Sequence, residues 1–105
     1  MSKAKDILME ARRLIQDVGF CKGRMHWIAN DDWIKDDKMA YCTFGAILEA
    51  TSRLGYYPGE SNLALNVFYK TLGENVYIHR WNDDPVRTKS EVLSQFLMAI
   101  DLCEE

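Results

Sequence analysis

The sequence lacks the short motifs that mark common nucleotide-binding, metalloprotease and hydrolase sites. GxGxxG, GxxxxGK[ST], HExxH and GxSxG are all absent from its 105 residues. No apolar run approaches the roughly 20 residues that a membrane-spanning helix needs. We therefore expect no membrane partner, and an enzyme is not the leading hypothesis.

Closely spaced metal-binding side chains are also lacking. The three cysteines, Cys21, Cys42 and Cys103, form no CxxC pair, and none of the short Cys/His spacings typical of zinc sites occurs. The first residues, Met1 to Asp6, do not resemble a signal peptide. These features predict a reducing, cytoplasmic location and a protein without metal or cofactor.

Neither sign of charge is in large excess. The chain has 13 Lys and Arg against 16 Asp and Glu, a formal net charge of −3. An extended nucleic-acid interface needs a dense face of Lys and Arg, so we do not expect one. The length and the 48% hydrophobic content instead suit one globular domain spanning residues 1–105.

Apolar residues recur at helical spacing in four segments, residues 3–18, 38–54, 61–72 and 89–102. Ser61 is a candidate N-cap of the third. The stretch between the first two has no clean period, and "NVYIHRW" at 75–81 alternates like a short strand. We predict a mainly α fold, a single compact domain of about four principal helices with an irregular loop between helices one and two.

The stretch "HRWNDDPVRTKSEV" at residues 79–92 contains a helix start. Thr88 followed by Glu91 forms a capping box, in which each side chain bonds the other residue's backbone amide. Pro85 disfavours helical geometry at Asp84. Half of this stretch is therefore explained by the start of the last helix.

The other half of the stretch, "WNDD", has two interpretations. In the structural one, Trp81 fills the core while the Asn and Asp side chains bond nearby amides to make a bend. In the functional one, Asn82, Asp83 and Arg87 form the polar wall of a pocket whose floor is Trp81. The sequence leaves both open.

Three runs, "GFCKG", "YCTFGAI" and "WNDDPVRT", together resemble a family of small bacterial and phage proteins classified only as a domain of unknown function. The most specific part of the resemblance is the pattern Trp-Asn-Asp-x-Pro-x-Arg-Thr. Phe20 stands where the family pattern suggests Trp. The resemblance implies a helical fold and a prokaryotic or phage origin, and it implies no activity. The matching positions are Gly19, Phe20, Gly23, Cys42, Gly45, Ala46, Ile47, Trp81, Asn82, Asp83, Pro85, Arg87 and Thr88.

Aromatic residues are more numerous than a small helical core needs, and several have an arginine nearby in the sequence. Aromatic rings beside guanidinium groups suit a stacked base, a phosphate or a protein hot spot, although many such rings are ordinary core residues. We therefore predict a non-enzymatic binding domain that recognises a host protein or a nucleotide-like small molecule. The candidate site joins residues 20–33 and 79–88, with Trp81, Asn82, Asp83, Arg87, Arg24 and Trp27 as contacts.

Two further hypotheses remain open. A small hydrolase could use Asp83 with Cys42 or His79, because catalytic pairs are defined by separation in space and leave no sequence mark. A phage origin would suit a counter-defence protein that blocks or sequesters a host component. This second hypothesis depends on the resemblance alone.

Overall fold

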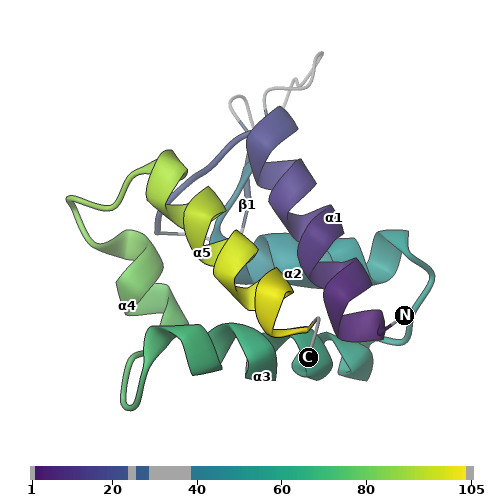
Figure 1. Ribbon diagram of the computed structural model, residues 1–105. Helices are drawn as coiled ribbons and strands as arrows, with labels where there is room; N and C mark the ends of the chain where they lie inside the picture. The colour runs from purple at the N-terminus through teal and green to yellow at the C-terminus, as the bar shows by residue number, and fades with distance from the viewer. Residues whose placement is uncertain (1, 24–25, 29–38, 104–105) are drawn as a thin grey trace.

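The structure is a computed structural model that describes residues 2–23, 26–28 and 39–103 (Figure 1). Its predicted class is confirmed, because the fold is mainly α. In chain order the elements are α1 (Lys3–Asp17), β1 (His26–Ile28), β2 (Met39–Tyr41), α2 (Thr43–Arg53), the 3-10 turn η1 (Pro58–Glu60), α3 (Ser61–Leu72), α4 (Ile78–Asp83) and α5 (Lys89–Leu102).

The α1 helix forms as the apolar periodicity predicts. Ser2 is its N-cap and accepts a hydrogen bond from the Lys5 amide at 3.0 Å. α1 and α5 lie side by side in Figure 1 and are joined by polar contacts at their edges. Arg12 donates to the Leu93 carbonyl at 3.1 Å and Lys89 to the Gln16 carbonyl at 3.1 Å.

The predicted start of the second helix, at residue 38, is wrong. Residues 39–41 form β2, which pairs antiparallel with β1, and α2 begins only at Thr43 with Cys42 as its N-cap. The Tyr41 amide donates to the Gly19 carbonyl at 2.9 Å, and the Cys21 amide donates to the Tyr41 carbonyl at 3.1 Å. Pairing on both sides of Tyr41 overrides the helical pattern of its apolar neighbours.

The α3 and α5 helices have the predicted bounds, with one correction at a helix start. Ser61 is the first residue of α3 and not its N-cap, which is Glu60. The Ser61 hydroxyl donates to the Pro58 carbonyl at 2.8 Å and so supports the preceding 3-10 turn. At α5 the predicted capping box of Thr88 and Glu91 is confirmed.

The predicted short strand at residues 75–81 is also wrong. The chain forms the short helix α4 instead, whose buried residues, Ile78 and Asn82, are spaced i, i+4 and so lie on one helical face. An alternating pattern this short fits both a strand period and a helical period, and among the described residues the only sheet is the pair of β1 and β2, which does not include 75–81.

A single cluster of buried side chains contains residues from all five α-helices. Phe68 of α3 is fully buried at its centre. Its ring lies 4.9 Å from the ring of Phe96 and 5.7 Å from the edge-on ring of Trp81. This aromatic contact connects α3, α4 and α5.

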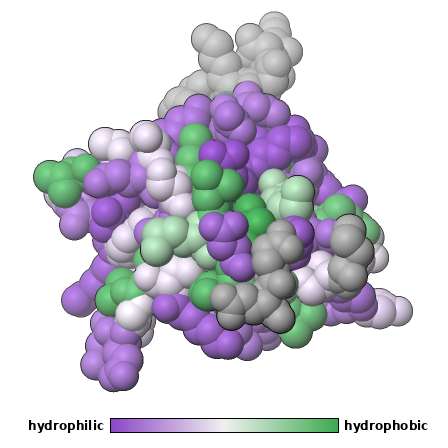
Figure 2. Space-filling model, viewed as in Figure 1, coloured by the Kyte–Doolittle hydropathy of each residue, from purple (hydrophilic) through white to green (hydrophobic). Residues whose placement is uncertain are grey.

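The surface over this core is mixed in character. Most of the face seen in Figure 2 is hydrophilic, with hydrophobic areas near the centre, where α5 lies in the same view of Figure 1. The exposed apolar side chains of α5 are Leu97, Met98 and Leu102. No helix in the described part of the chain is long and apolar enough to cross a membrane.

Replacing Phe68 by Ala should lower the free energy of unfolding by about 3–5 kcal/mol, because the change removes a fully buried ring and leaves a cavity. Urea denaturation at neutral pH measures the difference. Leu63→Ala, on the same helix at a side chain that is 46% exposed, is the control and should cost less than about 1 kcal/mol. Equal losses in the two variants would contradict the central position of Phe68.

Candidate functional site

Trp81 is held by both the core and a neighbouring arginine. Its ring is partly buried against Phe68. The Arg87 guanidinium lies over the Trp81 ring, 4.3 Å from the ring centroid, and Arg87 Nε donates to the Trp81 carbonyl at 2.9 Å. Both interactions hold the guanidinium over the indole, an arrangement favoured by cation–π attraction, and Arg87 Nη1 also lies 3.7 Å from Glu91 Oε1. Of the predicted contacts, Trp81 and Arg87 therefore meet directly.

Asn82 is buried and lies at the centre of a hydrogen-bond network. Its Oδ1 accepts from the Thr43 amide at 2.8 Å and from the Thr43 hydroxyl at 2.6 Å. Its Nδ2 donates to the Cys21 carbonyl at 3.1 Å and to Asp83 Oδ1 at 2.9 Å. Two acceptor sites and two donors are all in use, which is the full capacity of an amide side chain. Asn82 therefore binds parts of the protein itself, with only 1% of its surface exposed.

Asp83 extends the same network to the segment after α1. Its Oδ1 also accepts from the Gly23 amide at 2.9 Å. Burial by itself raises the pKa of Asp83, but the bonds from Gly23 and Asn82, with the charges of His79 and Lys22, hold the pKa below its ordinary value. Asp83 is therefore a carboxylate at neutral pH.

The two predicted loops do meet, but through bonds within the protein. Besides the contacts of Asn82 and Asp83, Lys22 Nζ donates to the Asp84 carbonyl at 2.8 Å and to the Pro85 carbonyl at 3.3 Å. Arg24 lies outside the described residues, as does the side chain of Trp27, whose backbone belongs to β1. The structure thus connects residues 21–23 to residues 82–85.

A pocket of about 320 Å³ lies beside α4, away from the hydrogen-bond network of Asn82 and Asp83. Its lining includes Trp81 and Arg87 but neither Asn82 nor Asp83. Within the described part of the chain, the side chains of Arg80 and Tyr77 make no hydrogen bond or ion pair, and Tyr77 is 66% exposed. The lining residues are Asn75, Val76, Tyr77, Arg80, Trp81, Asp84 and Arg87.

Neither Tyr77 nor Arg80 belongs to the site predicted from the sequence. Their helical spacing could have indicated a shared face only if 77–83 had been recognised as a helix. Asn75 was missed altogether. Its backbone adopts the left-handed conformation, with φ of 61°, which Asn tolerates better than most residues. This turn leads the chain from α3 into α4.

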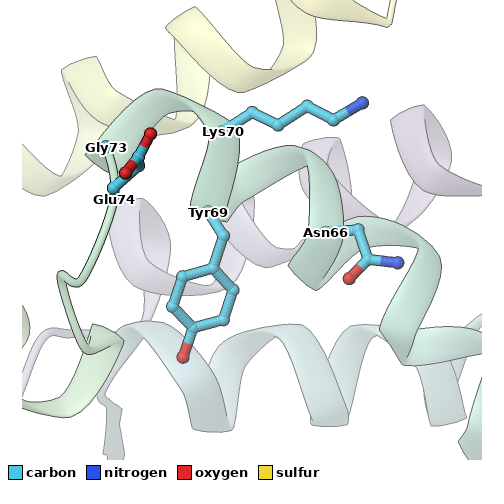
Figure 3. Close-up of a pocket in the computed structure, with 5 residues that line it drawn as sticks. All are labelled: Asn66, Tyr69, Lys70, Gly73 and Glu74. Atoms are coloured by element: carbon cyan, nitrogen blue, oxygen red, sulfur yellow. The ribbon is translucent and has the colours of Figure 1, made fainter.

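A second hollow, of about 330 Å³, lies along the last turns of α3 and is shown in Figure 3. Tyr69 and Lys70 leave the helix in different directions in this view. The Tyr69 hydroxyl accepts a hydrogen bond from the Ile78 amide at 3.4 Å. Because its polar groups diverge, this hollow is a weaker candidate than the pocket beside Trp81.

Two residues of the hydrolase hypothesis, Cys42 and His79, each have a structural role. Cys42 is 3% exposed, caps α2 and accepts from the Gly45 amide at 3.2 Å. Burial raises the pKa of the Cys42 thiol, which opposes the thiolate that a nucleophile requires. The His79 ring packs on Phe44, with centroids 5.0 Å apart. Among the described residues no three His, Cys, Asp or Glu side chains gather closely enough to hold a metal ion.

Replacing Asn82 by Ala should lower the free energy of unfolding by about 3 kcal/mol, since it leaves the buried Thr43 hydroxyl and the Cys21 carbonyl without their partner. Thermal and urea unfolding measure the loss. Asn66→Ala, at an exposed position of α3, is the matched control and should change stability by no more than about 0.5 kcal/mol. A loss below about 1 kcal/mol at Asn82 would show that the network is not structural.

Replacing Asp83 by Asn should flatten the acid dependence of stability. A carboxyl group whose pKa is lower in the folded state stabilises the protein above its unfolded pKa, and this contribution disappears as the pH falls through the folded pKa. The ordinary value for Asp83 is 3.8. Between about pH 5 and pH 2 the wild type should therefore lose more unfolding free energy than Asp83→Asn, as measured by urea denaturation at each pH. Asp101→Asn, at an exposed site on α5, should retain the wild-type slope.

Comparison with known proteins identifies the chain at the level of a family. A family model described as a family of unknown function, DUF6197, matches residues 1–102. No curated protein and no solved structure gives a significant match. The match extends over all five α-helices and both the hydrogen-bond network and the pocket. The chain therefore belongs to the family of unknown function DUF6197.

Proposed function

We propose that this protein is a non-enzymatic binding domain that recognises a small, planar, anionic ligand in the pocket beside Trp81. The single observation that carries the proposal is the Arg87 guanidinium fixed on the Trp81 ring at the edge of an open pocket. A rigid planar cation of this kind suits stacking and anion recognition together. A nucleotide-like molecule has both features.

Two polar side chains of the pocket, those of Arg80 and Tyr77, are available for a ligand, while Arg87 also contacts the Trp81 carbonyl and Glu91. Arg80 and Tyr77 make no side-chain hydrogen bond or ion pair with the described residues, whereas Asn82 and Asp83 are engaged within the protein. The ligand contacts that we propose are therefore Trp81, Arg87, Arg80 and Tyr77. This choice keeps two of the contacts expected from sequence and assigns Asn82 and Asp83 to positioning α4.

Binding is favoured over hydrolysis by the state of the candidate catalytic groups. Cys42 is buried with a raised pKa, and Asp83 Oδ1 already accepts two hydrogen bonds. A hydrolase would need one of these groups to face a substrate with a base in reach. The pocket beside Trp81 contains neither of them.

The setting that we propose for this binding is the cytoplasm of a bacterium or a phage-infected bacterium. The three cysteines form no disulfide, which suits a reducing compartment. The resemblance in the "WNDDPVRT" motif supports the prokaryotic or phage origin. In a phage, capture of a host ligand or blockade of a host protein would be a counter-defence role.

Native mass spectrometry of the protein, purified gently from bacterial cytosol, tests the proposal by comparing native and denatured masses. The wild type should retain extra mass that Tyr77→Ala/Arg80→Ala loses. The matched control Tyr57→Ala/Arg53→Ala, which removes an exposed tyrosine and an exposed arginine elsewhere, should retain it.

Chemical analysis of the released ligand separates the two classes of function. A binding domain returns the same molecule after prolonged incubation with the protein, whereas a hydrolase converts it. Retained mass that is unaffected by the pocket variant, or ligand turnover that depends on Cys42 or Asp83, would overturn the proposal.

A further inference from the structure

We propose that the ligand is a mononucleotide, whose base stacks on the outer face of the Arg87 guanidinium and whose phosphate pairs with Arg80. This inference rests on the proposed function and deepens it, because it assigns each half of the ligand to a side chain.

The stacking surface is the Arg87 guanidinium, backed by Trp81. The guanidinium lies over the indole, 4.3 Å from the ring centroid, and the bond from Nε to the Trp81 carbonyl anchors it there. The Arg87 side chain remains 19% exposed and lines the pocket. Proteins that recognise single-stranded RNA stack its bases on aromatic side chains or on Arg guanidinium planes. A base would thus complete a stack of ring, guanidinium and ring.

The charges of the pocket fit the two halves of a nucleotide. Arg80 is exposed and has no ion-pair partner among the described residues, so its guanidinium is available for a phosphate. Asp84 lines the same pocket, and its Oδ1 already accepts from the Val86 amide at 3.0 Å. A carboxylate repels phosphate but accepts from the amino group of a base, which places the base nearer Asp84 and the phosphate nearer Arg80.

The size of the pocket and the net charge of the protein favour a single nucleotide over a strand. A volume of about 320 Å³ lies at the lower end of the range for small-molecule sites. A longer nucleic-acid strand would extend over the surface of a protein whose formal net charge is −3. Such a surface offers few contacts to phosphates. The end of an oligonucleotide carries the same base and phosphate. The experiment must therefore distinguish a free mononucleotide from the end of an oligonucleotide.

Isothermal titration calorimetry at low salt tests the inference directly. The probes are the 5′-monophosphates of adenosine, guanosine, cytidine and uridine, inorganic phosphate, and a single-stranded trinucleotide. At least one monophosphate should bind saturably with one site per chain. Arg80→Ala should weaken this binding about tenfold or more, as expected for loss of a charge-assisted contact. The matched control Arg53→Ala should bind like the wild type, because Arg53 pairs with Glu49 on α2.

A second variant tests the stack separately from the charge. Arg87→Lys keeps the positive charge but removes the planar guanidinium. It should weaken binding of the nucleotide by about fivefold or more and weaken binding of inorganic phosphate much less. Unfolding curves check that the variant is folded. The exposed side chain of Arg80 makes Arg80→Ala the safer variant should Arg87→Lys unfold.

Three results would overturn the inference. Inorganic phosphate binding as tightly as the nucleotides would show an anion site without base stacking. A trinucleotide binding much more tightly, with a steep salt dependence, would identify a strand as the ligand. Failure of all four monophosphates to bind would exclude a mononucleotide. In each case the proposed function still stands if the Tyr77→Ala/Arg80→Ala protein loses a different retained ligand in native mass spectrometry.

Discussion

The structure depends on one buried amide, that of Asn82. Through four hydrogen bonds its side chain joins the start of α2, the segment after α1 and its own neighbour Asp83. An unpaired polar group at this depth would cost free energy, so the network forms fully or the packing fails. Within the described part of the chain no buried side-chain nitrogen or oxygen lacks a partner. The position of α4 follows from this one residue.

This constraint explains why a helix of six residues can line a pocket. An isolated helix so short is not stable in water, and α4 persists because its inward face, Ile78 and Asn82, is fixed. Arg80 then points away from this buried face, since each residue advances about 100° around the helix, whereas Trp81 lies partly buried against Phe68. The same short motif therefore contains a structural half and a half that lines the pocket. The structural interpretation of "WNDD" holds for Asn82 and Asp83, which bond within the protein and do not line the pocket, while Trp81 both packs on Phe68 and lines the pocket.

Local patterns explain which elements could be predicted from sequence. The bounds of α1, α3 and α5 follow from apolar periodicity, and the capping box at Thr88 and Glu91 places the start of α5. The patterns failed at residues 39–41 and 75–81. At the first, pairing of Tyr41 with β1 and Phe20 prevails over helix propensity. At the second, a stretch of seven residues is too short to separate a strand period from a helical one.

By itself, the sequence determined the mainly α class, three helices with their ends, and the importance of the stretch around Trp81. These properties are local, since caps and periodicity involve residues within a few positions of one another. Only the tertiary structure decided that Asn82 faces Thr43 and Cys21, which are 39 and 61 positions away, and that the Arg87 guanidinium lies over the Trp81 ring. The tertiary structure also decided that Arg80 and Tyr77 line the same pocket as Trp81 and Arg87. The physical reason is that burial of α4 against distant segments fixes which of its faces remains exposed.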